Sequence, residues 1–332
     1  MALRVDIGVF AHNEAAGIAG CLAALQAQDI FARDGVEARL VVLANGCSDA
    51  TVTVARAAGA EVADLPKGGK SRTWNRFVHD LSRWDADVLV FCDADISVPD
   101  RGALWRLVIG AGRQGAWVFN SQPVKDTVYA PFNLTAMDKI IASAAGGLDD
   151  WKTAICGQLY AMPAGRARGF HLPIGLPVED GFLRAMVLTD TLTAPEDFSR
   201  IDGGDVFHVY PSERDLAALI RHQVRIVIGS AINAASFAHL RRLPANQRAA
   251  ELVRAADDER WLSRVIKAEL PRGYGYVPPH FLTKRVTRAL ARPRDLLRPK
   301  RLFLTVLGAG FDLIVYAIAQ YKMARGVGAG FW

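Results

Sequence analysis

Asp93 and Asp95 stand directly after a short apolar segment and are suited to holding a divalent cation. The segment Asp87 to Cys92 predicts a buried central strand. Residues i and i+2 of an extended chain point to the same side, so the two carboxylates are expected to converge on one point. Such oxygen ligands suit Mg²⁺ or Mn²⁺, which keep positions open for substrate phosphates. The pair alone is weak support, because Asp is also a common turn residue.

Three other polar segments could bind a phosphate-bearing ligand. Residues 10–14 open the first predicted helix, whose N-terminal amides favour anions. Residues 45–51 follow the second predicted strand, and Lys70 could neutralise a phosphate. Taken singly, each segment is better explained as a cap, a turn or a solvated lysine. They support a nucleotide-diphosphate site only in combination with the aspartate pair.

Strand and helix signals alternate along the first half of the chain, and this alternation predicts where the polar segments lie. The expected elements are a strand over Arg4 to Ala11, a helix over Glu14 to Gln28, a strand over Arg39 to Ala44, a helix around Trp74 and the strand over Asp87 to Cys92. This order predicts an α/β fold with a mainly parallel sheet flanked by helices, whose ligands sit beyond the carboxyl ends of the strands. The second half is less regular, with a strand over Ala116 to Asn120 and helices from Ser212 onward.

Four motifs in order resemble glycosyltransferase family 2, the inverting transferases of the nucleotide-diphospho-sugar (GT-A) fold. They are "VFAHNEAAGI", "VVLANGCSDATV", "GGKSRTWN" and "FCDADI". Downstream, "GQLYAMPAGR", "LPVEDGFLRAMV" and "VFHVYPSERDLAALIRHQVRIVIG" are similar to the family's acceptor-side, E-D and H-x-x-P segments. The resemblance covers the chain to about residue 235.

The resemblance implies roles for named residues. Asp93 and Asp95 would be metal and diphosphate ligands, Asp180 the general base, and Glu14 and Asn45 nucleoside contacts. The same motifs imply donor contacts at three neighbouring positions, Ala11, Asn13 and Ala94.

Two further sets of side chains are candidates for the site. Arg221 and Arg225 lie four apart on one predicted helix face, where their guanidinium groups could clamp a diphosphate. His208 follows an apolar strand-like stretch and could complete a metal site, although a lone histidine is more often a satisfied core residue.

The implied reaction explains these residue types. Inversion by direct displacement needs one carboxylate to take the proton of the attacking hydroxyl, and a cation to stabilise the leaving diphosphate. We therefore expect Mn²⁺ or Mg²⁺ as cofactor and a nucleotide-diphosphate sugar as donor. UDP-sugars are the family's usual donors, but Ala44 stands where many members carry an Asp that contacts the base. His222 and Ile226 replace the Gln and Trp of the processive synthases, which favours a single transfer.

Composition and charge indicate the class of protein, its partners and its compartment. The hydrophobic fraction of 51% and charged fraction of 22% are those of a folded globular chain. The net charge of +6 is local, because residues 241–301 carry sixteen Lys and Arg against six acids. No nucleic-acid motif accompanies this basic stretch, so no nucleic-acid partner is expected. The four cysteines lack metal or disulfide spacing, and the N-terminus lacks a signal-peptide pattern, which together favour the cytoplasm.

The C-terminal region suggests contact with a membrane. Leu302 to Ala319 is an almost continuous apolar run behind basic residues, but it carries Asp312 near its middle. A helix lying in the membrane interface is favoured over a true span. The predicted organisation is a catalytic domain over 1–235 (nucleotide-binding half 1–115, acceptor half 116–235), a basic helical extension over 236–301 and an apolar helix over 302–332. A lipid-linked or cell-envelope hydroxyl acceptor at the cytoplasmic membrane face fits this organisation.

Three other functions remain open from the sequence. "VLVFCDADIS" also resembles haloacid dehalogenase-type phosphatases, in which Asp93 would be the nucleophile and Asp95 the acid. A nucleotidyltransferase could share the sheet topology, although the expected Gly-rich loop is missing. A non-catalytic membrane-binding protein would rest on the basic and apolar C-terminal residues alone.

Overall fold

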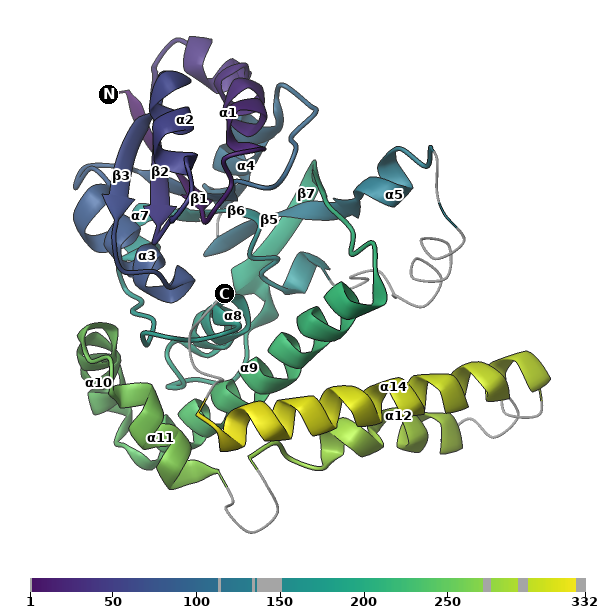
Figure 1. Cartoon of the computed structure of the whole chain (residues 1–332). Helices are drawn as coiled ribbons and strands as arrows, with labels where there is room; N and C mark the ends of the chain where they lie inside the picture. Colours follow the sequence, from purple (N-terminus) through teal and green to yellow (C-terminus); the bar gives the residue numbers. More distant parts are fainter. Residues whose placement is uncertain are drawn as a thin grey trace.

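A seven-stranded sheet forms the centre of the computed structural model, which describes residues 2–112, 115–132, 135, 151–270, 276–291 and 298–326 (Figure 1). The strands are β1 (Leu3–Ala11), β2 (Val36–Asn45), β3 (Glu61–Leu65), β4 (Val88–Asp93), β5 (Val118–Lys125), β6 (Leu159–Pro163) and β7 (Ile201–Tyr210). Their order in the sheet is β3-β2-β1-β4-β6-β5-β7. The predicted α/β fold with a mainly parallel sheet is thus confirmed.

One strand runs against the others and brings a distant segment to the ligand edge. The four neighbours β3, β2, β1 and β4 are parallel to one another, and β5 is parallel to β7. Strand β6 is antiparallel to both of its neighbours, β4 and β5. The start of β6 therefore lies beside the carboxyl end of β4. The backbone shows this directly, since the Asp93 amide donates to the Gln158 carbonyl at 2.7 Å.

Helices cover both faces of the sheet. They are α1 (Ile18–Gln26), η1 (Asp29–Ala32), α2 (Thr51–Ala57), α3 (Lys70–Arg76), the π-helical η2 (Phe77–Leu81), α4 (Ala103–Ala111), α5 (Asp126–Tyr129), η3 (Trp151–Thr153), α7 (Ala164–Ala167), α8 (Glu179–Thr189) and η4 (Phe198–Arg200). The C-terminal helices are α9 (Leu216–Arg242), α10 (Ala245–Asp257), α11 (Trp261–Glu269), α12 (His280–Leu290) and α14 (Pro299–Ala324).

Two apolar cores result from the alternation of side chains along buried strands. In β4, Leu89 and Phe91 belong to one core, which extends over α8 and α9. Val90 and Cys92 belong to the other, which extends over α1 and α4. Gly8 of β1 allows close packing on the first side, because a Cβ there would lie 2.9 Å from Cε1 of Phe77.

The structure differs from several predicted boundaries. Helix α1 begins at Ile18 rather than at Glu14, because residues 14–17 form a turn closed by hydrogen bonds to the Glu14 carbonyl. The edge strand β3 was not predicted; it is short and only half-buried. The predicted boundary at residue 235 falls inside α9, where Ala235 is buried, and the boundary at 301 falls inside α14. Buried residues continue past 235 in α9, whereas α14 continues past 301 with exposed apolar residues.

The last helices form a separate arm. Helices α12 and α14 lie side by side and project away from the sheet (Figure 1). The C-terminal half of α14 packs on α9, with Val315, Ala319 and Met323 buried. We call α12 together with α14 the C-terminal arm.

Candidate active site

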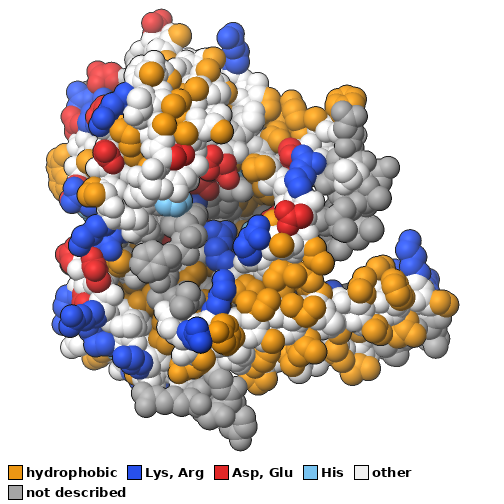
Figure 2. All heavy atoms as spheres, viewed as in Figure 1, with side chains coloured by type: hydrophobic (Ala, Val, Ile, Leu, Met, Phe, Trp, Pro, Cys, Tyr) orange, Lys and Arg blue, Asp and Glu red, His pale blue; other side chains and the backbone are white. Residues whose placement is uncertain are grey.

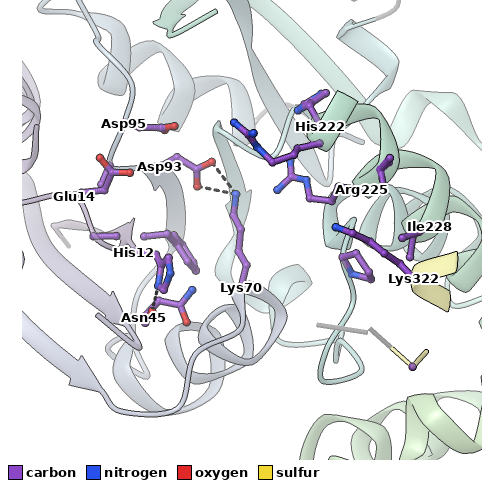
Figure 3. A pocket seen from close by; sticks show the side chains of 17 residues that line it. His12, Glu14, Asn45, Lys70, Asp93, Asp95, His222, Arg225, Ile228 and Lys322 are labelled. Carbon is purple, nitrogen blue, oxygen red and sulfur yellow. Dashed lines mark hydrogen bonds and ion pairs between the residues drawn. The ribbon is translucent and has the colours of Figure 1, made fainter. Parts of the chain in front are cut away.

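A cavity of about 730 Å³ opens at the carboxyl ends of the central strands and reaches α9 and α14. It brings together residues that are far apart in the sequence (Figure 3). Of the predicted site residues, those that line it are Ala11, Glu14, Asn45, Lys70, Asp93, Ala94, Asp95, Arg221 and Arg225. Asn13, Asp180 and His208 do not line it. Phe10 and His12, which also line it, belong to the polar segment 10–14 that the sequence analysis named. The sequence analysis predicted no site role for the remaining lining residues, namely Pro177, His222, Val224, Ile228, Lys322 and Gly326.

Carboxylates dominate the wall formed by the strand ends. Asp93 is the last residue of β4, and Asp95 follows in an exposed turn rather than in extended chain. Glu14 lies on the same wall (Figure 3). Burial raises the pKa of Glu14 above its ordinary value, with smaller contributions from Asp95 and Asp49. This wall therefore holds concentrated negative charge.

Lys70 stands among these acids at the start of α3. Its Nζ lies 2.7 Å from both carboxylate oxygens of Asp93 and 3.4 Å from Oε1 of Glu179, and it donates to the Gly157 carbonyl at 3.1 Å. Burial alone would lower the pKa of Lys70, but Asp93, Glu179 and Asp180 together raise it above its ordinary value. Burial raises the pKa of Asp93 to about 7 although Lys70 opposes the change.

Asn45 positions the segment that carries Lys70. Its Oδ1 accepts hydrogen bonds from the Gly69 amide at 2.7 Å and from Oγ1 of Thr73 at 2.9 Å. Gly69 has a φ of +125°, a conformation that favours glycine. Nδ1 of His12 donates to the Asn45 carbonyl at 2.6 Å. Asn45, which is predicted to contact a nucleoside, thus joins the segments after β1, β2 and β3 through its side chain and its backbone carbonyl.

The amides predicted to bind an anion at the first helix already have partners. The Glu14 amide donates to Oγ1 of Thr51 at 2.7 Å, and the Ala15 amide donates to Oδ2 of Asp49 at 3.1 Å. Asn13 adopts a positive φ of 56° and accepts from the Ser48 amide at 2.8 Å. The prediction of an anion site at these amides is wrong, because the turn before α1 pairs them with the loop after β2. Asn13 braces that loop instead of lining the cavity.

Asp180 lies in the first turn of α8, close to the loop before β6. A Cβ on Gly157, whose φ is +58°, would lie 3.1 Å from Oδ2 of Asp180. Burial raises the pKa of Asp180 to about 6, and Glu179 adds to the rise, whereas Lys70 and Arg225 oppose it. The side chain of the predicted base is partly exposed, and it shares the charge environment of Lys70.

The start of α8 depends on close packing against α9. The Val178 carbonyl accepts from Nδ2 of Asn233 at 2.9 Å, and a Cβ on Gly229 would lie 2.3 Å from Cγ2 of Val178. We expect Gly229→Ala to lower the free energy of unfolding by about 1–3 kcal/mol, the usual cost of overpacking. Urea denaturation measures this loss. Gly20→Ala, where a Cβ meets no atom within 4 Å, is the control and should instead stabilise by about 0.5–1 kcal/mol. Equal stability of the two variants would contradict the packing argument.

Cations line the opposite wall of the cavity. Arg221 and Arg225 come from α9, and Lys322 comes from the C-terminal end of α14. Arg225 and Lys322 lie across the cavity from Glu14 and Asp93 (Figure 3), and Figure 2 shows the hollow with acidic and basic side chains on its two sides. A ligand that carries both a cation and anionic groups matches this arrangement, because each part faces the opposite charge.

His208 is not available as a metal ligand in this arrangement. It is fully buried in β7, where Nδ1 pairs with Oγ of Ser121 at 2.9 Å and Nε2 pairs with Oε1 of Gln158 at 3.0 Å. Both nitrogens that could bind a metal are thus occupied. The prediction of a metal role for His208 is corrected accordingly, since the alternation along β7 turns the ring into the sheet's packing.

The pH dependence of stability should report the buried neutral state of His208. Burial lowers its pKa to about 4, below the unfolded value of about 6.5, so the unfolded chain binds the proton first as pH falls. The contribution of neutral His208 to the free energy of unfolding is fully present above about pH 6.5. It is lost as the pH falls toward 4, by up to roughly 3 kcal/mol. Urea denaturation at pH 7 and pH 4 should show a larger loss for the wild type than for His208→Gln. Parallel losses in the two proteins would contradict this assignment.

The donor set on the acidic wall fits a hard divalent cation. Asp93, Asp95 and Glu14 offer carboxylate oxygens, which Mg²⁺ and Mn²⁺ prefer, and exposed Asp95 leaves room for water and phosphate ligands. Among the residues that the structure describes, no group of three or more His, Cys, Asp or Glu side chains is placed to hold a metal ion by itself. The wall therefore resembles an open site that a ligand would complete, rather than a structural metal cage.

Comparison with known proteins finds a family model and several solved structures that are similar to parts of this chain. Residues 6–124 match the family model "Glycosyl transferase family 2". A comparison with curated proteins finds no significant match. Among solved structures, mannosyltransferase PcManGT from Pyrobaculum calidifontis, in complex with GDP-Man and Mn²⁺, is similar with a TM-score of 0.54 and 17% identity, covering 97% of this chain and 88% of that one.

Two further solved structures are less similar. Glucosyl-3-phosphoglycerate synthase from Mycobacterium tuberculosis has a TM-score of 0.45 and 21% identity, covering 69% of this chain and 77% of that one. Mannosyl-3-phosphoglycerate synthase from Rubrobacter xylanophilus has a TM-score of 0.47 and 17% identity, covering 69% and 73%. The matched residues 6–124 contain β2, β3 and β4, most of β1 and β5, and the acids Glu14, Asp93 and Asp95 of the acidic wall. Residues 6–124 thus match the glycosyltransferase family 2 model, and the chain has the GT-A fold of the solved mannosyltransferase.

Proposed function

We propose that the protein transfers a sugar, with inversion, from a nucleotide-diphosphate donor to an acceptor hydroxyl. The observation that carries the proposal is the cavity with carboxylates on one wall and three cations on the other. A metal–diphosphate complex has the matching charge pattern. The mannosyltransferase of similar fold is in complex with GDP-Man and Mn²⁺, which supports the same donor class here.

Asp93 and Asp95 would hold Mn²⁺ or Mg²⁺, with Glu14 close by. The bound cation would stabilise charge on the leaving diphosphate. Arg221 and Arg225 would bind the phosphate oxygens from the opposite side, where charge-assisted hydrogen bonds strengthen as the sugar bond breaks. Lys70 holds Asp93 in place and limits the repulsion between neighbouring acids.

Asp180 is the proposed general base. It takes the proton of the acceptor hydroxyl while that oxygen attacks the sugar carbon and the bond to the diphosphate breaks. A pKa of about 6 suits this task, because the carboxylate predominates at neutral pH and still binds a proton appreciably. Glu179, which contacts Lys70, orients the start of α8.

The donor class is proposed from the family resemblance, and the acceptor class is proposed from helix α14. We propose a UDP-sugar donor, by analogy with the family's usual donors. A lipid-linked acceptor at the cytoplasmic membrane face is proposed from α14, which is long and apolar enough to cross a membrane, with mean hydropathy 2.1 and 11% of its apolar window buried. The rival phosphatase interpretation is less favoured, because it leaves the cationic wall without a role and Asp93 is held by Lys70.

Nucleotide binding is the direct test of the donor site. We expect one of UDP, GDP, CDP and dTDP to raise the thermal midpoint of the wild type in the presence of Mn²⁺, because a ligand that binds the folded state stabilises it. The rise should disappear without Mn²⁺ and in Asp93→Ala/Asp95→Ala. Asp205→Asn, an exposed carboxylate on β7 outside the cavity, is the matched control and should respond like the wild type. If millimolar nucleotide leaves the wild type unchanged, the donor site is not where we propose it.

A further inference from the structure

The C-terminal arm combines strong positive charge with an exposed apolar face. Its described residues, 276–291 and 298–326, contain eight Lys and Arg but one acid, Asp312. Basic residues stand at the start of α14, at Arg298, Lys300 and Arg301, and along α12, at Lys284 and Arg288. This composition complements a surface that is both apolar and negatively charged.

The apolar face runs along α14, mainly over its projecting half and partly over the exposed side of the half that packs on α9. Figure 2 shows hydrophobic side chains running along the arm. The large hydrophobic residues of α14 that are about half exposed or more are Leu302, Phe303, Leu304, Val306, Leu307, Leu313, Ile314 and Tyr321. Scattered exposed hydrophobics are ordinary on protein surfaces, but this concentration of large ones on one projecting helix marks an interaction surface.

Asp312, the single acid among the described residues of the arm, is paired with an arginine within it. Nε of Arg285 on α12 donates to Oδ2 of Asp312 at 2.6 Å, and its Nη2 donates to Oδ1 at 3.0 Å. Gly308 makes room for this pair, because a Cβ there would lie 2.8 Å from the guanidinium carbon of Arg285. A two-pronged Arg–carboxylate pair is well suited to an apolar setting, where an unpaired Asp would be costly.

The same helix contributes to the active-site cavity. Val315, Ala319 and Met323 fix the C-terminal half of α14 against α9, and Lys322 projects into the cavity from this half (Figure 3). Lys322 therefore belongs to the same helix that carries the apolar face. Arg221 and Arg225 of the same wall come from the helix on which α14 packs.

We propose that the arm docks as one unit on the surface of an anionic lipid bilayer, with the apolar face of α14 among the lipid chains and the Arg285–Asp312 pair closed. We further infer that Lys322, carried by this docked helix, is a binding residue for the donor diphosphate. The second part rests on the proposed function; the first does not. Lipid is the occupant that matches both the apolar row and the surrounding basic residues.

Flotation with vesicles tests the docking. We expect the wild type to float with vesicles of phosphatidylcholine and phosphatidylglycerol in equal parts, and at least tenfold less with phosphatidylcholine alone. Leu304→Glu/Leu307→Glu should lose at least tenfold in binding, whereas Val253→Glu, at an exposed apolar position on α10, should not. Equal flotation of the double variant and the wild type would overturn the proposal. The proposal would also fail if the wild type is a dimer, the double variant is a monomer and neither protein floats with vesicles. A second copy of the chain, rather than lipid, would then cover the apolar face.

Charge-matched variants test the ion pair. Arg285→Gln leaves Asp312 without its partner, and Lys284→Gln removes the same charge from an exposed neighbour. We expect Arg285→Gln to float several-fold less than Lys284→Gln, and Arg285→Gln/Asp312→Asn to recover the Lys284→Gln level. Identical flotation of all three would remove the role of the pair.

Lys322→Gln separates docking from donor binding. We expect it to float like the wild type but to need at least tenfold more nucleotide for the same thermal stabilisation. An unchanged nucleotide response would overturn the role of Lys322. If no nucleotide stabilises even the wild type, the proposed function fails, while the flotation results still decide the docking independently.

Discussion

Asp180→Asn is expected to slow sugar transfer at least about a hundredfold, the usual scale for the loss of a general base. The amide keeps the size of the carboxylate and can still accept from the Gly181 amide, which Oδ1 of Asp180 does at 2.7 Å. The start of α8 should therefore stay folded. The amide side chain cannot take the proton of the acceptor hydroxyl at neutral pH, so the attack on the sugar carbon loses its general base.

Transfer to the acceptor and nucleotide-induced stabilisation are the two measurements for this variant. We expect the second to match the wild type, because Asp180 does not line the cavity where the nucleotide is proposed to bind. A normal transfer rate would move the base elsewhere, first to Glu179, the neighbouring acid. The anomeric configuration of the product, followed by NMR, tests inversion separately; retention would exclude direct displacement.

Lys70→Met is expected to lower the free energy of unfolding by about 3–5 kcal/mol, the range for breaking a buried ion pair by removing one partner. Lys70 contacts Asp93 and Glu179 with only 12% of its side chain exposed, and it also offsets the charge of Asp180. Without the ammonium group, three acids face one another in a poorly hydrated site. Urea denaturation at pH 7 and pH 5 measures the loss, which should shrink at pH 5 because the acids can then take up protons.

Two controls separate charge from packing in this prediction. Lys70→Met/Asp93→Asn removes one of the repelling acids and should recover a substantial part of the stability. Mn²⁺ should stabilise Lys70→Met more than the wild type, because it supplies positive charge to the same wall. A loss under about 1 kcal/mol, or a double variant less stable than Lys70→Met, would show that Lys70 is not the counter-ion of this site.

The local arrangement of the acidic wall could be predicted from sequence because it depends on short segments after strands. The apolar run before Asp93 and the polar turn after Ala44 each indicate a strand end, and parallel strands bring such ends to one edge. Asp93, Asn45 and Lys70 accordingly meet in the cavity. The turn before α1 was missed because Glu14 continues a helical pattern, while hydrogen bonds to Thr51 hold it outside the helix.

The other parts of the site depend on long-range packing that leaves little trace in the sequence. The loop at Gly157 reaches Lys70 only because β6 runs antiparallel beside β4, and no local pattern fixes that direction. His208 follows an apolar stretch as many ligands do, yet Ser121 and Gln158 on other segments occupy its nitrogens. Lys322 ends an apolar run that indicates a membrane, and only the packing of α14 on α9 reveals its place in the cavity.

The arrangement of Lys322 opposite Glu14 has a consequence for the synthesis of the protein. A ribosome adds about 5–20 residues per second, and N-terminal parts generally fold first. The acidic wall can therefore form while α9 and α14 are still being made, but the lining of the cavity is complete only when residue 326 has left the exit tunnel. A nascent chain thus acquires its whole donor cavity at the same late moment as the arm that we propose to meet the membrane. Enzyme maturation and membrane targeting would then be a single event in time.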